Sequence, residues 1–209
     1  MVSPVAQLFK KEENIKRVQA KLPYLFQMAE LESSRAGKIG MEVGSLRERI
    51  IVALLVYVFG ENNVDTNLPI TNSETDVIVL GHKLSIKTIT GNGGVKAVWT
   101  VDAKSAQNFI KNYSPQCEIL LTKIVWGLEA GGFFLIPLEV QNIILRKLGS
   151  NTYLKPPKEG TNPRGVEFSK EALTSMLEHP STLKIKINWQ KSTINFNIYE
   201  RWIDYWASN

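Results

Sequence analysis

The stretch SETDVIVLGHKLSIKTIT, at residues 73–90, contains two short apolar runs with charged residues beside and within them. Asp76 precedes the first apolar run and Lys87 lies inside the second, and the glycine between the runs predicts a β-hairpin. We expect Gly81 and His82 to form a two-residue type II′ turn, because glycine readily adopts the positive φ of its first central position. This register places Asp76 opposite Lys87, where the two charges form either a structural ion pair or part of a catalytic centre.

Two further polar residues accompany this pair. Ser85 lies two residues before Lys87, so both side chains share one face of the strand. Glu48 lies in the helix predicted for residues 45–60, three residues after the expected N-cap Ser45. This spacing is typical of a capping box, which gives Glu48 a structural role as the alternative to a catalytic one.

The helix followed by two strands resembles the PD-(D/E)XK nuclease family, whose strands carry an aspartate, then an acidic residue, any residue and a lysine. Asp76 and Lys87 correspond to the aspartate and the lysine of this pattern. The sequence departs from it at Thr75, which replaces the proline, and at Ser85, which replaces the second acid. Some members of the family place that carboxylate on the helix, where Glu48 is the corresponding residue.

The resemblance implies a chemistry for each of these residues. Asp76 and Glu48 would bind Mg²⁺, which prefers oxygen ligands and keeps several waters, and the backbone carbonyl of Ile86 would also coordinate it. The metal would activate a water and offset charge on the scissile phosphate. Lys87 would orient or help deprotonate that water and stabilise the transition state. Ser85 either hydrogen-bonds to a metal-bound water or only fills space.

Within the family, the resemblance is to type II restriction endonucleases. It implies Mg²⁺-dependent cleavage of double-stranded DNA at a short palindrome, namely CGCG cut to blunt ends, with no small-molecule cofactor. A palindromic site also implies a homodimer, because the symmetry of the protein matches that of its site. The aromatic C-terminal segment, with Trp202, Tyr205 and Trp206, is expected to pack in a core or at the dimer interface.

The order of predicted elements indicates an α/β (α+β) fold with a central mixed β-sheet flanked by helices, the PD-(D/E)XK nuclease-like core. Helices are predicted at residues 5–32 (with a bend or break at Pro23), 45–60, 103–112, 138–148 and 169–178. Besides the hairpin, strands are predicted at residues 95–101, 117–126, 132–136, 182–189 and 192–199. We expect one domain over 1–209, with an N-terminal helical segment and loop (1–44), the catalytic core (45–136) and further helices and strands (137–209).

Composition limits the class of protein. The chain has 209 residues, and no apolar run reaches the roughly 18 residues that a membrane-spanning helix needs. The single cysteine, Cys117, excludes an internal disulfide framework and a multi-cysteine zinc site. The N-terminal segment lacks the apolar core of a signal peptide, so we expect a cytoplasmic protein.

A formal net charge of +5 favours a polyanionic partner, although a basic solvated surface has the same composition. Loop 33–45 carries Arg35 and Lys38 and leads into the helix of Glu48, so it is expected near the substrate. Loop 151–165 carries four residues of the types that contact phosphates and base edges. These are Lys155, Lys158, Asn162 and Arg164. A loop that is merely solvated would look the same.

Met41 lies in the first of these loops, between Gly40 and Glu42. A methionine there either inserts between base pairs as an apolar wedge or packs into the core beneath its loop.

Two alternatives to a restriction enzyme remain. One is a structure-selective junction or repair nuclease of the same fold. The other is a non-catalytic DNA-binding protein on a decayed nuclease fold, which the serine at position 85 would suit.

Overall fold

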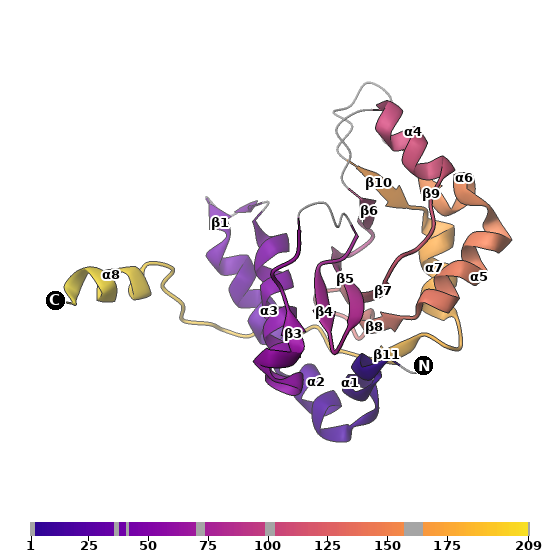
Figure 1. Ribbon diagram of the computed structural model, residues 1–209. Coiled ribbons are helices and arrows are strands. Elements are labelled where there is room, and N and C mark those ends of the chain that lie inside the picture. The colour runs from indigo at the N-terminus through magenta and orange to yellow at the C-terminus, as the bar shows by residue number, and fades with distance from the viewer. Residues whose placement is uncertain are drawn as a thin grey trace.

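The computed structural model describes residues 3–35, 38–40, 42–69, 74–98, 103–156 and 165–208. Within these residues the centre of the fold is a six-stranded β-sheet (Figure 1). In spatial order its strands are β11 (Leu183–Ile185), β8 (Gly132–Ile136), β7 (Glu118–Ile124), β5 (His82–Thr90), β4 (Val77–Val79) and β3 (Val64–Asp65). The β5–β7 pair is parallel and the other neighbouring pairs are antiparallel, so the predicted central mixed sheet is confirmed.

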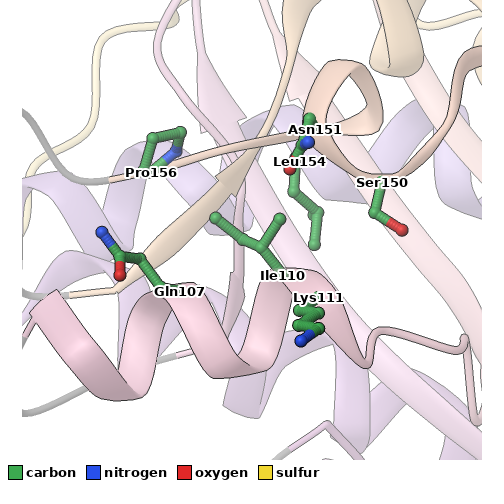
Figure 2. Close-up of a pocket in the computed structure, with 7 residues that line it drawn as sticks. All are labelled: Gln107, Ile110, Lys111, Ser150, Asn151, Leu154 and Pro156. Carbon is green, nitrogen blue, oxygen red and sulfur yellow. The ribbon is translucent and has the colours of Figure 1, made fainter.

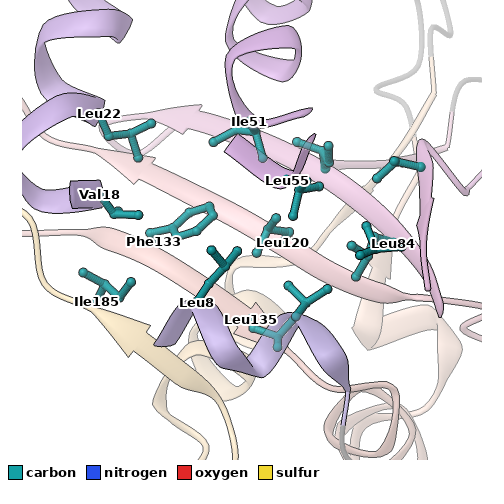
Figure 3. Close-up of a cluster of buried hydrophobic side chains, with 14 of the residues drawn as sticks. Leu8, Val18, Leu22, Ile51, Leu55, Leu84, Leu120, Phe133, Leu135 and Ile185 are labelled. Atoms are coloured by element: carbon teal, nitrogen blue, oxygen red, sulfur yellow. The ribbon is translucent and has the colours of Figure 1, made fainter. Parts of the chain in front are cut away.

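One face of this sheet is covered by the N-terminal helices. These are η1 (Pro4–Ala6), α1 (Gln7–Lys10), α2 (Glu12–Glu32) and α3 (Val43–Phe59), which the short η2 (Glu61–Asn63) follows. Leu84 of β5 and Leu120 of β7 belong to the same buried cluster as Ile51 and Leu55 of α3 (Figure 3). The helix that carries Glu48 therefore packs directly against the strands that carry the hairpin charges.

The opposite face is covered by later parts of the chain. These are α4 (Ala103–Lys111), α5 (Leu138–Leu148), α6 (Ser150–Tyr153), α7 (Lys170–Glu178) and a small antiparallel sheet of β6 (Lys96–Val98), β10 (Val166–Phe168) and β9 (Leu154–Lys155). Ile119 and Leu121 of β7 lie in this second core with Val140 and Met176. Because β7 is buried on both faces, the consecutive residues Ile119, Leu120 and Leu121 in its centre are all apolar.

The helices agree with the predictions in part. Those predicted at residues 138–148 and 169–178 are present as α5 and α7. The predicted break at Pro23 is absent, because α2 continues through the proline while Leu22 and Phe26 on either side of it are buried in the sheet core. No helix in the described part of the chain is long and apolar enough to span a bilayer.

The start of α3 differs from the prediction. The helix begins at Val43, its N-cap is Glu42, and no side chain caps it. Ser45 lies inside the first turn, so the predicted capping box of Ser45 and Glu48 is wrong. The preceding segment is a short hairpin of β1 (Ser34–Arg35) and β2 (Lys38–Ile39). It ends soon enough for the helix to begin at an earlier residue than predicted. Glu48 therefore has no capping role.

The C-terminal strand predicted at residues 192–199 is also wrong. That segment contains no described strand and leads into α8 (Glu200–Ala207). Ser192 exchanges two hydrogen bonds with the side chain of Gln27 on α2, at 2.9 and 2.7 Å. At Ser192 a helix side chain therefore satisfies the backbone groups that a neighbouring strand would otherwise pair with.

The hairpin of β4 and β5 turns one residue earlier than predicted. Val79 pairs with His82, so the central turn residues are Leu80 and Gly81. Both have positive φ, 49° and 82°, which identifies a type I′ turn instead of the predicted type II′ turn. Type I′ geometry matches the right-handed twist of the strands, and this outweighs the strain of leucine in the left-handed region.

Replacing Leu120 with alanine is expected to lower the free energy of unfolding by about 2–5 kcal/mol, since the substitution leaves a cavity in a fully buried site. Urea unfolding followed by circular dichroism measures the change. The control is Leu128→Ala at an exposed position, which should change stability by less than about 0.5 kcal/mol. Equal losses in both variants would contradict this description of the core.

Replacing Leu80 with asparagine is expected to raise the free energy of unfolding by roughly 1 kcal/mol, because asparagine tolerates the left-handed conformation that strains leucine. Leu80→Ala keeps the strain and serves as the control in the same urea titration. A stabilisation by alanine as large as that by asparagine would show that the turn conformation is not the cause.

Candidate active site

The Asp76 carboxylate is held by three donors on β5. Its Oδ2 accepts hydrogen bonds from the backbone N–H of Ile86 at 2.6 Å and from the Ser85 hydroxyl at 3.1 Å. The Nζ of Lys87 lies 3.4 Å from the same oxygen. The observed register, extended by one residue beyond the Val77–Leu84 pair, places Asp76 opposite Ser85 and not opposite Lys87 as predicted. The side chains of Asp76 and Lys87 are nevertheless in contact.

The contact between Lys87 and Asp76 is loose and partly solvated. Their side chains are 19% and 35% exposed, respectively. Ion pairs of this kind contribute about 0–1 kcal/mol, so fold stability gives little reason to keep both charges here.

Glu48 of α3 lies at the same site. It lines a pocket of about 350 Å³ together with Arg49, Thr75, Asp76 and Ile86. Burial and the negative charge of Asp76 raise the pKa of Glu48, whereas Lys87 acts in the opposite direction. The structure thus brings together Glu48, Asp76 and Lys87 from a helix and two strands.

The donor set of this pocket suits a hard cation. No group of three or more histidine, cysteine, aspartate or glutamate side chains that could hold a metal occurs among the described residues. Glu48, Asp76 and Ile86 line one pocket, however, and carboxylate and carbonyl oxygens are the ligands that Mg²⁺ prefers. Because Mg²⁺ usually keeps several waters, two carboxylates fit it without a full protein cage.

Ser85 is buried, and its hydroxyl donates to Asp76. The side chain therefore has a defined contact and does more than fill space. Because it orients a carboxylate oxygen, it contributes to the geometry of the site without adding charge.

Two charged residues near the site were missed in the sequence. Arg49 follows Glu48 and lines the pocket. Glu74 lies two residues before Asp76; burial raises its pKa, and a hydrogen bond from the Gln116 backbone and the charge of Lys87 lower it. The sequence could have indicated both residues, because Glu74 lies close to Asp76 and Arg49 directly follows Glu48.

Cys117 lies close to Glu74, with its Sγ 3.4 Å from the Glu74 backbone carbonyl oxygen. Burial, chiefly, raises the pKa of the Cys117 thiol to about 12. The thiol is therefore protonated at neutral pH, as expected of a core residue without a catalytic role.

The predicted DNA-contacting residues are spread over two regions. Arg35 and Lys38 lie in the β1–β2 hairpin, where Lys38 is exposed, and Lys155 is exposed in β9. Figure 1 shows β1 above α3 and β9 near α4 and α6, with β4 and β5 between them. The other predicted contacts lie outside the described residues: Met41, Lys158, Asn162 and Arg164.

A larger pocket, of about 670 Å³, lies between α4 and the α6–β9 segment (Figure 2). It is lined by Gln107, Ile110, Lys111, Ser150, Asn151, Leu154 and Pro156. Among the described residues this lining contains no carboxylate, histidine or cysteine, in contrast to the smaller pocket of Glu48 and Asp76.

Comparisons with known proteins identify the family of the chain. A solved structure described as "Restriction endonuclease in complex with substrate DNA" is 50% identical in sequence and has a TM-score of 0.90. The similarity covers 98% of this chain and 99% of that one. No curated protein sequence matches the chain significantly.

The sequence pattern of one family, described as "Restriction endonuclease ThaI", matches residues 8–208. This match spans nearly the whole chain and includes the helix and both strands of the site. The chain therefore belongs to the ThaI restriction endonuclease family, whose enzymes hydrolyse phosphodiester bonds.

Proposed function

We propose that this protein is a Mg²⁺-dependent endonuclease of the type II restriction class that cuts both strands of double-stranded DNA at a short palindrome. The observation that carries the proposal is that Glu48 and Asp76 line one pocket while the Lys87 ammonium lies 3.4 Å from the Asp76 carboxylate. Further support comes from the 50% identical structure, which is described as a restriction endonuclease bound to substrate DNA.

Each residue has a distinct part in this proposal. The three β5 donors all meet Oδ2 of Asp76, so we assign Oδ1 to the cation. Glu48 supplies the second carboxylate, and the carbonyl of Ile86 supplies a neutral oxygen. Bound Mg²⁺ would lower the pKa of a water and offset charge on the phosphate.

Lys87 is the residue that we assign to the attacking water. Its ammonium has three donors, of which one is directed to Asp76 in the loose 3.4 Å contact. The others can orient the water and stabilise negative charge that develops on the phosphate oxygens. Ser85 keeps Asp76 in place while this occurs.

DNA contacts are assigned to basic residues around the pocket. Arg49 lies in the pocket wall, so we propose that it binds a phosphate next to the scissile one. Arg35, Lys38 and Lys155 would bind phosphates farther along the duplex.

The remaining contacts are proposed from their residue types. Lys158, Asn162 and Arg164 would reach base edges or phosphates, and Met41 would insert between base pairs.

For the recognition sequence we propose CGCG, cut to blunt ends, in keeping with the family to which the chain belongs. Guanine offers O6 and N7 to arginine or lysine, which suits a basic protein reading a site made only of G·C pairs. A two-fold homodimer would present one active site to each strand.

Cleavage of a plasmid that contains CGCG sites is expected to need Mg²⁺ and to stop in EDTA. Asp76→Asn and Lys87→Met should each slow it by roughly 10²–10⁴-fold, because they remove the metal ligand and the charge at the attacking water. The matched control is Lys83→Met, an exposed lysine on the same strand, which should cleave within about twofold of the parent.

The fragments themselves separate the alternatives. Discrete blunt-ended fragments that map to CGCG support the proposal, and fragments at another sequence would overturn that site. Cleavage restricted to branched DNA would indicate a junction or repair nuclease. Binding without cleavage would indicate a decayed nuclease fold.

Glu48→Gln is expected to abolish cleavage but to raise the melting temperature, by on the order of 2 °C. The raised pKa of Glu48 means that its ionised form destabilises the folded state. The gain should be largest above the folded-state pKa and vanish as the pH falls below the ordinary glutamate range, where Glu48 is protonated in both states.

Differential scanning fluorimetry in EDTA measures this at several pH values, with Glu42→Gln as a control at an exposed position six residues earlier. A lower melting temperature for Glu48→Gln at neutral pH would mean that the fold, and not the reaction, requires this carboxylate.

A further inference from the structure

A second buried charge cluster lies behind the site, centred on Glu30 of α2. This carboxylate is almost fully buried and receives three donors. Oε1 accepts from Arg47 Nη2 at 2.6 Å and from the Trp126 indole N–H at 2.7 Å. Oε2 accepts from Lys191 Nζ at 3.0 Å. One side chain thus joins α2 to α3, to the segment after β7 and to the segment after β11.

Arg47 extends the cluster to the catalytic strand. Its Nη1 donates to the Thr90 hydroxyl at 3.0 Å, and its guanidinium lies 5.5 Å from the centre of the Phe26 ring. The same planar group therefore contacts Glu30 on one side and β5 on the other. Only an arginine can do this, because its fork directs several N–H groups along fixed axes, whereas lysine presents a single point charge.

The cluster adjoins the site on both of its sides. Arg47 immediately precedes Glu48 on α3, and Thr90 follows Lys87 by three residues on β5. The contact between Arg47 and Thr90 therefore fixes how the helix of Glu48 lies on the strand of Lys87. In the described part of the chain, neither Glu30 nor Arg47 lines the pocket of Glu48 and Asp76.

Stability alone is a poor explanation for this cluster. Apolar residues of similar volume often stabilise a fold as well as a buried ion pair does, since the charges must lose their hydration. Arg47 also has a buried Nε that finds no partner among the described residues. The Glu30–Arg47 pair instead provides directional hydrogen bonds. Through Arg47 these bonds hold α3 and β5 in one relative position.

We propose that Glu30 and Arg47 are positioning residues that hold Glu48 at the distance from Asp76 and Lys87 that metal binding requires. This inference rests on the proposed function of those three residues. Lys191 and Trp126 complete the cluster from outside, where the Lys191 ammonium lies 5.0 Å from the centre of the Trp126 ring.

The mildest test is Thr90→Val, which removes only the acceptor of Arg47 on β5 and lies at an exposed position, so the protein should fold. We expect the Mg²⁺ concentration for half-maximal cleavage to rise about 3–10-fold, the size expected when one hydrogen bond that positions the helix of Glu48 is lost. High Mg²⁺ should restore most of the rate. DNA affinity in EDTA should be unchanged.

The matched control is Thr122→Val on the neighbouring strand. Thr122 is fully buried, and its hydroxyl has no partner among the described residues. The same substitution there should leave both the Mg²⁺ requirement and the rate within about twofold.

Arg47→Lys tests the fork itself, because it keeps the charge beside Glu30 but cannot reach Thr90 at the same time. It should reproduce the Mg²⁺ shift of Thr90→Val. Direct Mn²⁺ binding, followed by electron paramagnetic resonance without DNA, should weaken by a similar factor in both variants. This readout does not depend on cleavage.

Unchanged Mg²⁺ and Mn²⁺ affinities in Thr90→Val and Arg47→Lys would overturn the proposal, even with a lowered melting temperature, because the cluster would then be only structural. If Asp76→Asn and Glu48→Gln still cleave DNA at the parent rate, the catalytic roles proposed for these residues are wrong. The two failures are therefore distinguishable, since the first leaves those catalytic variants inactive.

Discussion

The parallel pairing of β5 with β7 is the constraint from which the rest of the architecture follows. Parallel neighbours cannot be joined by a tight turn, so the chain between them makes a crossover that includes β6 and α4. A parallel pair also needs cover on both faces, which α3 supplies on one side and α5 and α7 on the other. Asp76 lies just before β4, and it lines a pocket together with Glu48 of α3.

Within that space, the hydrogen bonds of Asp76 explain the departure from the usual motif. The Ser85 hydroxyl lies 3.1 Å from Asp76 Oδ2 and donates to it. A carboxylate at position 85 would place a second negative charge against the first, whereas serine supplies a donor. The second carboxylate comes instead from α3, whose packing against β5 brings Glu48 to the pocket. A charge that is absent from the strand is thus provided by tertiary packing.

This solution has an energetic cost, which shows in the raised pKa of Glu48. A carboxylate held partly buried beside another is destabilising unless a cation joins them, and such local strain is typical of functional sites. The buried Glu30–Arg47 pair lies on the other side of the same helix–strand contact. We interpret the two clusters as parts of one arrangement. The hydrogen bonds of Arg47 to Glu30 and Thr90 hold α3 in place against the repulsion between Glu48 and Asp76.

The sequence by itself determined the residue types of the site, the hairpin, the mixed sheet and helices such as α5 and α7, because these depend on local periodicity and composition. Tertiary structure alone decided the Leu80–Gly81 turn, since strand twist outweighs the local preference of leucine. It also moved the start of α3 to Val43 and brought Ser192 to Gln27 of α2, where hydrogen bonds to a helix side chain replace the predicted strand pairing. The Glu30–Arg47 cluster could not be predicted at all. Its residues come from five separate segments of the chain. Each of them acquires its hydrogen-bond partner only when the fold buries Glu30 and Arg47 together.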